Sequence, residues 1–159
     1  MVCYVLVGIL GIIVGFFAAW VIIVQNVRKN SNQVKNLQKN IDVLNQWLIL
    51  KSEGLSLAAV LEDKKIYKIA IYGMGICGRH LIRELENTRI EICYGMDMKV
   101  KGQYKNIHIY KPGATEQPVD AIINTVIYDE TNIVNNLKNY YSCKILNLSD
   151  LIFNGYIKK

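Results

Sequence analysis

Three glycines at a fixed spacing are the residues of this chain with the clearest chemical meaning. They lie in Gly73-Met74-Gly75-Ile76-Cys77-Gly78, which is a complete G-x-G-x-x-G pattern. In this pattern the first glycine permits a tight turn, the second lets main-chain amides approach a phosphate, and the third lets a helix pack closely against its strand. The N-terminus of that helix supplies N–H groups and partial positive charge. The motif therefore predicts a diphosphate-binding turn.

The elements around the glycines match a Rossmann-type unit. The apolar run Lys68–Tyr72 predicts a buried strand immediately before them, and apolar residues at helical spacing follow them. A second predicted strand, Ile90–Met96, ends at Asp97, which lies 19 residues beyond Gly78. A carboxylate at this place accepts hydrogen bonds from a ribose diol. Asp97 has a second interpretation, in which it only closes the turn before Lys99.

Further apolar runs predict an α/β fold, a Rossmann-like parallel sheet of about five strands. The later strands are expected at Ile107–Tyr110, Ala121–Val126 and Lys144–Leu148, with a helix after Asp129 and a last helix capped by Ser149. Ligands of open α/β sheets bind beyond the carboxyl ends of the strands, which makes Asn124, Thr125 and Tyr128 candidates for the pocket wall. The predicted cofactor-binding residues are Gly73, Met74, Gly75, Ile76, Cys77, Gly78, Asp97 and Thr125.

The chain begins with an apolar segment that predicts a membrane anchor. The first charged residue is Arg28, and Val2–Val24 carries no charge. A helix of that length reaches roughly 35 Å, enough to cross a hydrocarbon core of ~30 Å. Nothing basic precedes the run and no cleavage site follows it, which favours a transmembrane helix in residues 1–25 over a cleaved signal peptide. The basic residues after it predict an N-terminus outside the cell membrane and a globular domain in the cytoplasm.

The net charge of +6 is concentrated in the stretch that follows this segment. Between Gln25 and Lys51 there are five basic residues and one acidic residue, Asp42, whereas the remaining residues are nearly balanced. A nucleic-acid-binding protein is expected to carry its basic residues on the folded domain. The charge distribution therefore argues against nucleic acid as a partner.

Residues 26–51 predict a helical connector between the anchor and a nucleotide-binding domain in residues 52–159. Apolar residues recur in the connector at the spacings of a heptad repeat, and they are Val34, Leu37, Ile41, Leu44 and Leu48. This row predicts either a short coiled coil that joins copies of the chain into a homo-oligomer or a single amphipathic helix that lies on the domain or on lipid headgroups. Gly54 ends the pattern, and Ser56 is expected to cap a short helix over Leu57–Asp63.

Three segments, Trp47–Gly54, Lys68–Gly75 and Val119–Ile123, carry a resemblance to a known group of domains. From about Trp47 to Phe153 the chain resembles the small Rossmann-like domains, often labelled nucleoside-diphosphate-sugar epimerase-like, that are encoded with bacterial glycosyltransferases. The glycine turn also resembles the N-terminal domain of bacterial sugar acyltransferases, where it holds a UDP-sugar. The resemblance implies an NAD(P) or UDP-sugar ligand, a glycosyltransferase-type partner and a role in surface-polysaccharide synthesis.

The chain departs from true epimerases and short-chain dehydrogenases where they carry a catalytic Tyr-x-x-x-Lys pair on a helix. Tyr140 and Lys144 have this spacing, but Lys144 falls in a predicted strand, so the two side chains would not share a helical face. His80 is expected on a helix surface and His108 on a strand face. The four cysteines contain no Cys-x-x-Cys pair and predict buried free thiols. No catalytic set and no metal site is predicted, and whether the chain is an enzyme stays open.

These observations lead to three hypotheses. The first is a membrane-anchored cytoplasmic module that binds a nucleotide or nucleotide sugar and is accessory to surface-polysaccharide synthesis. The second is one half of an NAD(P)-dependent oxidoreductase or epimerase, whose substrate region comes from a partner chain. The third is a structural adaptor with an empty Rossmann domain, which uses its helices to assemble.

Overall fold

The computed structural model describes residues 2–100, 102–115 and 117–155, with side chains from Gly15 onward except that of Ala18. The chain divides into two compact units, residues 1–38 and 39–159. The first contains the larger part of helix α1 (Val2–Ser52), and the last turns of this helix belong to the second unit.

Among the residues whose side chains are described, no helix contains an apolar stretch long enough to cross a membrane. Most of the predicted anchor, Val2–Val24, lies outside those residues. The anchor therefore stays a prediction.

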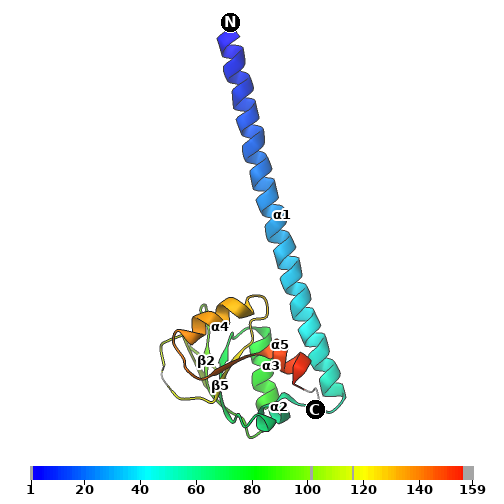
Figure 1. Cartoon of the computed structure of the whole chain (residues 1–159), viewed down its shortest axis with the longest axis vertical. Coiled ribbons are helices and arrows are strands. Elements are labelled where there is room, and N and C mark those ends of the chain that lie inside the picture. Colours follow the sequence, from blue (N-terminus) through cyan, green and yellow to red (C-terminus); the bar gives the residue numbers. More distant parts are fainter. Residues whose placement is uncertain (1, 101, 116, 156–159) are drawn as a thin grey trace. The chain divides into compact units, whose positions relative to one another are not determined.

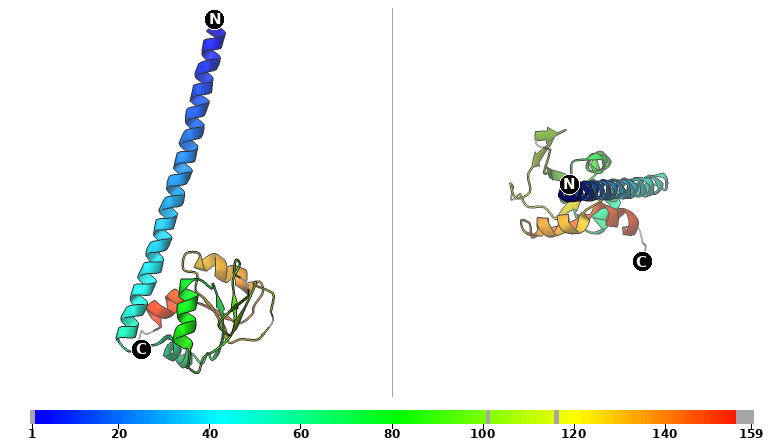
Figure 2. Two further views of the ribbon diagram at one scale, coloured as in Figure 1. Left: turned by 180° about the vertical axis from the view of Figure 1, so that it is seen from behind. Right: turned by 90° about the horizontal axis from the view of Figure 1, so that it is seen from above.

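A six-stranded, mostly parallel sheet forms the centre of the second unit (Figures 1 and 2). Its strands are β1 (Lys68–Tyr72), β2 (Glu91–Met96), β3 (Gly102–Tyr104), β4 (Ile107–Tyr110), β5 (Ala121–Asn124) and β6 (Lys144–Asn147). The strand order is β3-β4-β2-β1-β5-β6, and every neighbouring pair is parallel except β3 and β4. The α/β class with five parallel strands is confirmed, and the antiparallel strand β3 is an addition that the sequence did not predict.

The order in which the chain adds strands to the sheet reverses at β1. From β1 the chain passes to β2 on one side, and it later returns to β5 on the other side. Tyr72, the last residue of β1, is in register with Met96 of β2 and with Asn124 of β5. The three strands therefore end at the same level, and the space beyond them is where ligands of open α/β sheets bind.

Four shorter helices accompany the sheet: α2 (Leu57–Asp63), α3 (Ile76–Leu85), α4 (Glu130–Lys138) and α5 (Leu148–Asn154). The Ser56 hydroxyl caps α2 as predicted, because it accepts a hydrogen bond from the Ala59 amide at 3.2 Å. The predicted cap at Ser149 is wrong. The N-cap of α5 is Asn147, two residues earlier, and the Ser149 hydroxyl donates instead to the Glu130 carboxylate at 2.6 Å.

Two apolar cores cover the two faces of the sheet. The larger core joins one face to α2, α3, α5 and the end of α1, and it contains Ile69 and Ile71 of β1 together with Leu81 of α3 and Leu151 of α5. The smaller core joins the other face to α4 through Leu137. Alternation along β1 sends Ile69 and Ile71 to one face and Ala70 to the other, which is the expected period of two.

The end of α1 packs on the domain through Val43, Trp47 and Leu50, which are all buried. Most of the heptad row lies on a different face of this helix, where Ile41 is 51% exposed and Leu48 is 67% exposed. Leu44, between them, is half-buried and packs against the larger core. The choice between a coiled coil and an amphipathic helix therefore stays a prediction.

Candidate functional site

The three glycines occupy three different steric environments in the turn between β1 and α3. Gly73 has φ of +94°, and a Cβ there would lie 2.6 Å from the Val126 side chain. A Cβ at Gly78 would overlap the carbonyl oxygen of Gly73, so this glycine lets the helix approach the turn. Gly75 is exposed, and a Cβ there would meet nothing within 4 Å. These are the steric roles that the glycine pattern requires.

The N-terminus of α3 opens beside Gly75. The helix begins at Ile76, its N-cap is Gly75 without a capping side chain, and the Arg79 amide donates to the Gly75 carbonyl at 3.1 Å. The amides between these positions precede the first helical hydrogen bond and have no acceptor within the helix. Such N–H groups, together with the positive end of the helix dipole, attract an anion.

Asp97 is bound to main-chain amides on two loops. One carboxylate oxygen accepts from the Met74 amide at 2.8 Å, inside the glycine turn. The other accepts from the amides of Lys99 at 2.7 Å and Val100 at 3.0 Å. Burial alone would raise the pKa of Asp97, but these hydrogen bonds, aided by the Lys99 charge, outweigh it and hold the pKa below 3.8. Asp97 therefore closes the turn after β2, and its predicted contact with a ribose stays a prediction.

Thr125 and Asn124 join the ends of neighbouring strands. The Thr125 hydroxyl is buried and donates to the Gly73 carbonyl at 2.6 Å. The Asn124 side-chain amide donates to Asn147 at 3.0 Å, and its oxygen accepts from the Val126 amide at 3.1 Å. Two of the three side chains expected in the pocket wall thus form hydrogen bonds within the protein.

The side chains between the glycines differ in their access to a ligand. Met74 is buried against β2, where a Cβ on Gly95 would lie 2.8 Å from its sulfur. Cys77 faces the core, and burial raises the pKa of its thiol. Ile76 is exposed. Because Met74 and Cys77 point inward, only their main-chain groups face the predicted site.

Arg79 is a polar residue of this region that the sequence analysis missed. Its Nε donates to the Met74 carbonyl at 3.3 Å, and its guanidinium carbon lies 5.0 Å from the centre of the Tyr104 ring. A cation over an aromatic face is held by the ring quadrupole. Arg79 therefore adds a positive charge beside the glycine turn. Its position directly after the last glycine was a usable signal, but its partner Tyr104 lies on the unpredicted strand β3.

Tyr72 and Tyr128 lie at the same carboxyl edge. Burial raises the pKa of Tyr72 first, and the negative charge of Asp97, the neighbouring Tyr128 and the charge of Asp129 raise it further. The phenol therefore stays protonated at neutral pH and is available as a hydrogen-bond donor or acceptor. Tyr128 is exposed, and its place on a pocket wall stays a prediction.

Tyr140 and Lys144, to which the sequence analysis gave no catalytic role, lie in different segments of the structure. Tyr140 follows the end of α4, whereas Lys144 opens β6, so the pair does not share a helix. His80 is exposed on α3 and His108 is exposed on β4, as expected. Cys77, Cys93 and Cys143 are free thiols. Within the described part of the chain, no three side chains are grouped to hold a metal ion.

A groove of about 430 Å³ lies between the end of α1 and α3, away from the glycine turn. Its lining combines three apolar side chains with four polar ones, and consists of Leu44, Trp47, Leu48, Lys51, His80, Arg83 and Glu84. None of the predicted cofactor-binding residues belongs to it.

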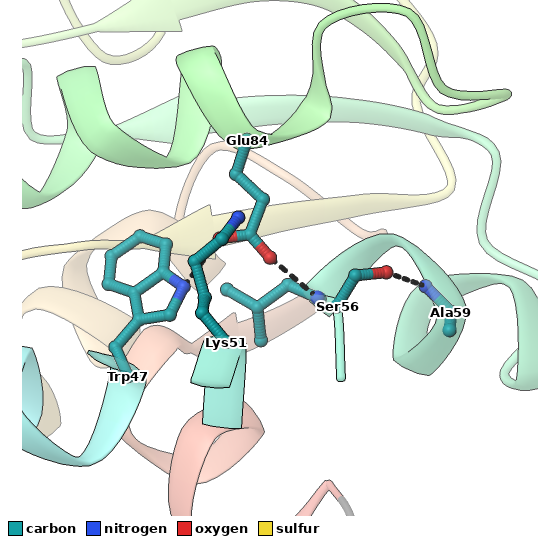
Figure 3. Close-up of polar contacts among 6 residues, drawn as sticks. Trp47, Lys51, Ser56, Ala59 and Glu84 are labelled. Atoms are coloured by element: carbon teal, nitrogen blue, oxygen red, sulfur yellow. Dashed lines mark hydrogen bonds and ion pairs between the residues drawn. The ribbon is translucent and has the colours of Figure 1, made fainter. Parts of the chain in front are cut away.

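Glu84 of α3 binds residues of α1 and α2 beside this groove (Figure 3). Its carboxylate accepts hydrogen bonds from the Trp47 indole at 2.5 Å and the Leu57 amide at 2.8 Å, and it lies 3.3 Å from the Lys51 ammonium. The Glu84 side chain is only 5% exposed. A buried carboxylate with these partners ties α3 to the end of α1 and the start of α2.

Comparisons of the chain with models of protein families, with curated protein sequences and with solved structures found no match. The chemistry of the glycine turn therefore has to be inferred from its own geometry.

Proposed function

We propose that residues 39–159 bind the diphosphate of a nucleotide or nucleotide sugar at the turn between β1 and α3. The observation that carries this proposal is the combination of an open Gly75 with a tightly packed Gly73 and Gly78. Packing alone explains the outer two glycines, because side chains there would clash with Val126 or with the main chain. It does not explain the glycine at position 75, where the protein leaves room for a side chain. Access for a ligand explains it.

The electrostatics of the turn support the same proposal. The first amides of α3, which have no acceptor within the helix, and the guanidinium of Arg79 provide positive charge where a diphosphate would approach. Asp97 and Tyr72 lie at the neighbouring strand ends and would face the ribose or the sugar. NAD(P) and UDP-sugars both carry a diphosphate, and both are candidates.

The setting of this module is a further part of the proposal. The apolar segment Val2–Val24 anchors the chain in the cell membrane, and the basic residues after it keep the domain in the cytoplasm. The module then serves a glycosyltransferase-type partner in surface-polysaccharide synthesis, which is the role that the resemblance of the domain implies.

Substitution of Gly75 tests the proposal directly. In Gly75→Leu the new side chain enters open space, and φ of −75° suits any residue, so the fold is expected to be unchanged. The leucine would occupy the space above the amides and abolish binding. The measurement is the thermal unfolding midpoint of the full chain in detergent with NAD, NADP, UDP and UDP-sugars at millimolar concentration. A ligand at 100 times its Kd adds about 2.7 kcal/mol to the free energy of unfolding.

The matched control is Asn135→Leu, which adds the same side chain at an exposed position of α4. This variant should respond to ligand as the wild type does. A wild-type chain that none of the ligands stabilises, or a ligand response that survives Gly75→Leu, would overturn the proposal.

A structural adaptor with an empty Rossmann domain is the second candidate, and one observation favours it. Asp97 already accepts the Met74 amide inside the turn, and Thr125 already bonds the Gly73 carbonyl. The turn is therefore stable by itself. An adaptor would keep its cellular function in the Gly75→Leu variant, whereas a nucleotide-binding module would lose it.

A further inference from the structure

An apolar row runs along the last turns of α1. Within the second unit it consists of Ile41 and Leu48, which are exposed, and of Leu44, which is half-buried and packs against the larger core. The sequence pattern continues the same spacing to Val34 and Leu37. In heptad terms Val34, Ile41 and Leu48 are a positions, and Leu37 and Leu44 are d positions. Large aliphatic side chains at a regular spacing on a solvated helix face need a partner to be buried.

We infer that this row, together with the groove beside it, is the interface for α1 of a second copy of the chain, packed in parallel and in register. The choice of residues supports this partner. Two of the three a positions carry a β-branched residue, Val34 and Ile41, and both d positions carry leucine. This arrangement favours a parallel coiled coil of two strands.

The charges beside the row also select a second copy. From position 33 to position 45, the flanking g and e positions carry only neutral amide side chains, which are Gln33, Gln38, Asn40 and Asn45. The nearby Lys35 and Lys39 occupy b and f positions, away from the seam. In a parallel pair, each g or e position faces the equivalent surface of the partner, where like charges would repel. Neutral flanks allow identical helices to pair, whereas a different partner chosen by charge would need charged flanks.

The groove continues this interface onto the domain. Leu44 and Leu48 belong to the row and also line the groove, whose other wall is α3 with His80 and Arg83. A helix packed on the row therefore lies beside α3 and covers the groove. The next d position is Lys51, which pairs with Glu84, so the apolar seam ends where the groove ends. The interface is independent of the glycine turn and does not rest on the proposed nucleotide.

Cysteine crosslinking of the full chain in its membrane or in lipid nanodiscs tests the inference. Leu48→Cys and Ile41→Cys place thiols at a positions, and they are compared with Ile49→Cys and Asp42→Cys, one residue farther along. Ile49 is a matched control because it is also a large aliphatic residue, 42% exposed, at a b position. All variants carry Cys3→Ser, since the other native thiols lie at least partly buried in the domain. Copper phenanthroline then forms disulfides between thiols that meet.

The expected result is a covalent dimer of twice the chain mass at positions 41 and 48, and little or none at 42 and 49. Equal crosslinking at 48 and 49 would overturn the inference, as would no dimer at all. Crosslinking of Leu48→Cys only to a protein of another mass would overturn it in favour of a different partner. Crosslinking between Leu48→Cys and Val34→Cys chains, without crosslinks within either variant, would overturn the parallel register.

A measurement of mass without crosslinking provides a second test. Light scattering of the detergent-solubilised full chain should show a dimer for the wild type and for Ile49→Asn. Leu48→Asn should raise the dimer dissociation constant by about tenfold or more, as loss of a central interface anchor does. Circular dichroism shows whether each variant remains folded. An unchanged dissociation constant for a folded Leu48→Asn chain would contradict the inference.

Discussion

At the scale of single residues, Asp97 joins the glycine turn to the turn after β2 through three main-chain amides. Its carboxylate therefore has a structural task whether or not a ribose is bound. Loss of the side chain would free the Met74 amide and loosen the wall of the site. For this reason a decrease in ligand binding by Asp97→Ala would not identify a ribose contact, and Gly75→Leu is the cleaner variant.

The lowered pKa of Asp97 predicts a stability that depends on pH. Because the folded state holds this pKa below 3.8, the contribution of Asp97 is fully present above pH 3.8 and is lost as the pH falls through the folded value. Asp97→Asn should thus be less stable than the wild type at pH 7, and the difference should shrink below pH 3.8. Urea unfolding followed by circular dichroism measures it.

The control for this pH dependence is Asp63→Asn, at the exposed end of α2. Its free energy of unfolding should differ from that of the wild type by less than about 0.5 kcal/mol at either pH. A difference between Asp97→Asn and the wild type that is the same at pH 3 and pH 7 would show that the carboxylate charge has no such role.

At the scale of the elements, α3 carries different partners at its two ends. Its N-terminus meets the glycine turn, and its C-terminal half holds Glu84, which binds Trp47 of α1 and the Leu57 amide of α2. One ten-residue helix thus fixes both the candidate site and the junction with α1. A substitution at this junction is expected to lower the free energy of unfolding before it changes the glycine turn.

Glu84→Leu tests how strongly this junction is held. The substitution leaves the buried Trp47 indole and the Leu57 amide without their acceptor, which should lower the free energy of unfolding by about 1–3 kcal/mol. Glu86→Leu is the matched control, because the exposed ion pair of Glu86 with Lys105 contributes about 1 kcal/mol at most. Denaturant unfolding compares the two, and equal losses would mean that Glu84 does not fasten the helices.

At the scale of the whole molecule, the second unit begins within α1 rather than after it. Val43, Trp47 and Leu50 are part of the larger core, and the unit starts at Lys39. A chain shortened to residues 39–159 is therefore expected to keep the free energy of unfolding of the longer chain. A chain shortened to residues 52–159 exposes the surface that these three side chains cover and should lose at least about 4 kcal/mol.

Denaturant unfolding of the two shortened chains measures this difference. Equal stability of the fragments 39–159 and 52–159 would contradict the assignment of the last turns of α1 to the domain. A fragment 39–159 that is much less stable than the full chain would contradict the boundary at Lys39.

The part of the fold predicted from the sequence is the part that local patterns encode. The β1–α3–β2 unit follows from an apolar run, a glycine turn and helical spacing within 30 residues. Strand β3 was missed because Gly102–Tyr104 shows no apolar alternation and forms only by pairing with β4. The docking face of α1 was missed because Glu84, the acceptor for Trp47, lies 37 positions away and no local pattern connects them.

The sequence predicted the main-chain turn of the candidate site, but it did not predict where the side chains of the site point. The three glycines follow from their spacing, because turn geometry is local. The inward orientation of Met74 and Cys77, and the bond from Thr125 to Gly73, depend on which strand lies beside which. Strand order is a property of the assembled sheet, so these side chains could not be placed in advance.

The bond between Trp47 and Glu84 also gives the molecule an optical reporter of its own. Indole emission responds to nearby charges and to solvent, and the Trp47 indole is bonded to a carboxylate and lies nearly perpendicular to the His80 ring at 6.4 Å between ring centres. The other tryptophan of the chain, Trp20, belongs to the first unit and can be replaced by phenylalanine. Ultraviolet fluorescence of that variant would then follow the release of α1 from the domain separately from the melting of the sheet.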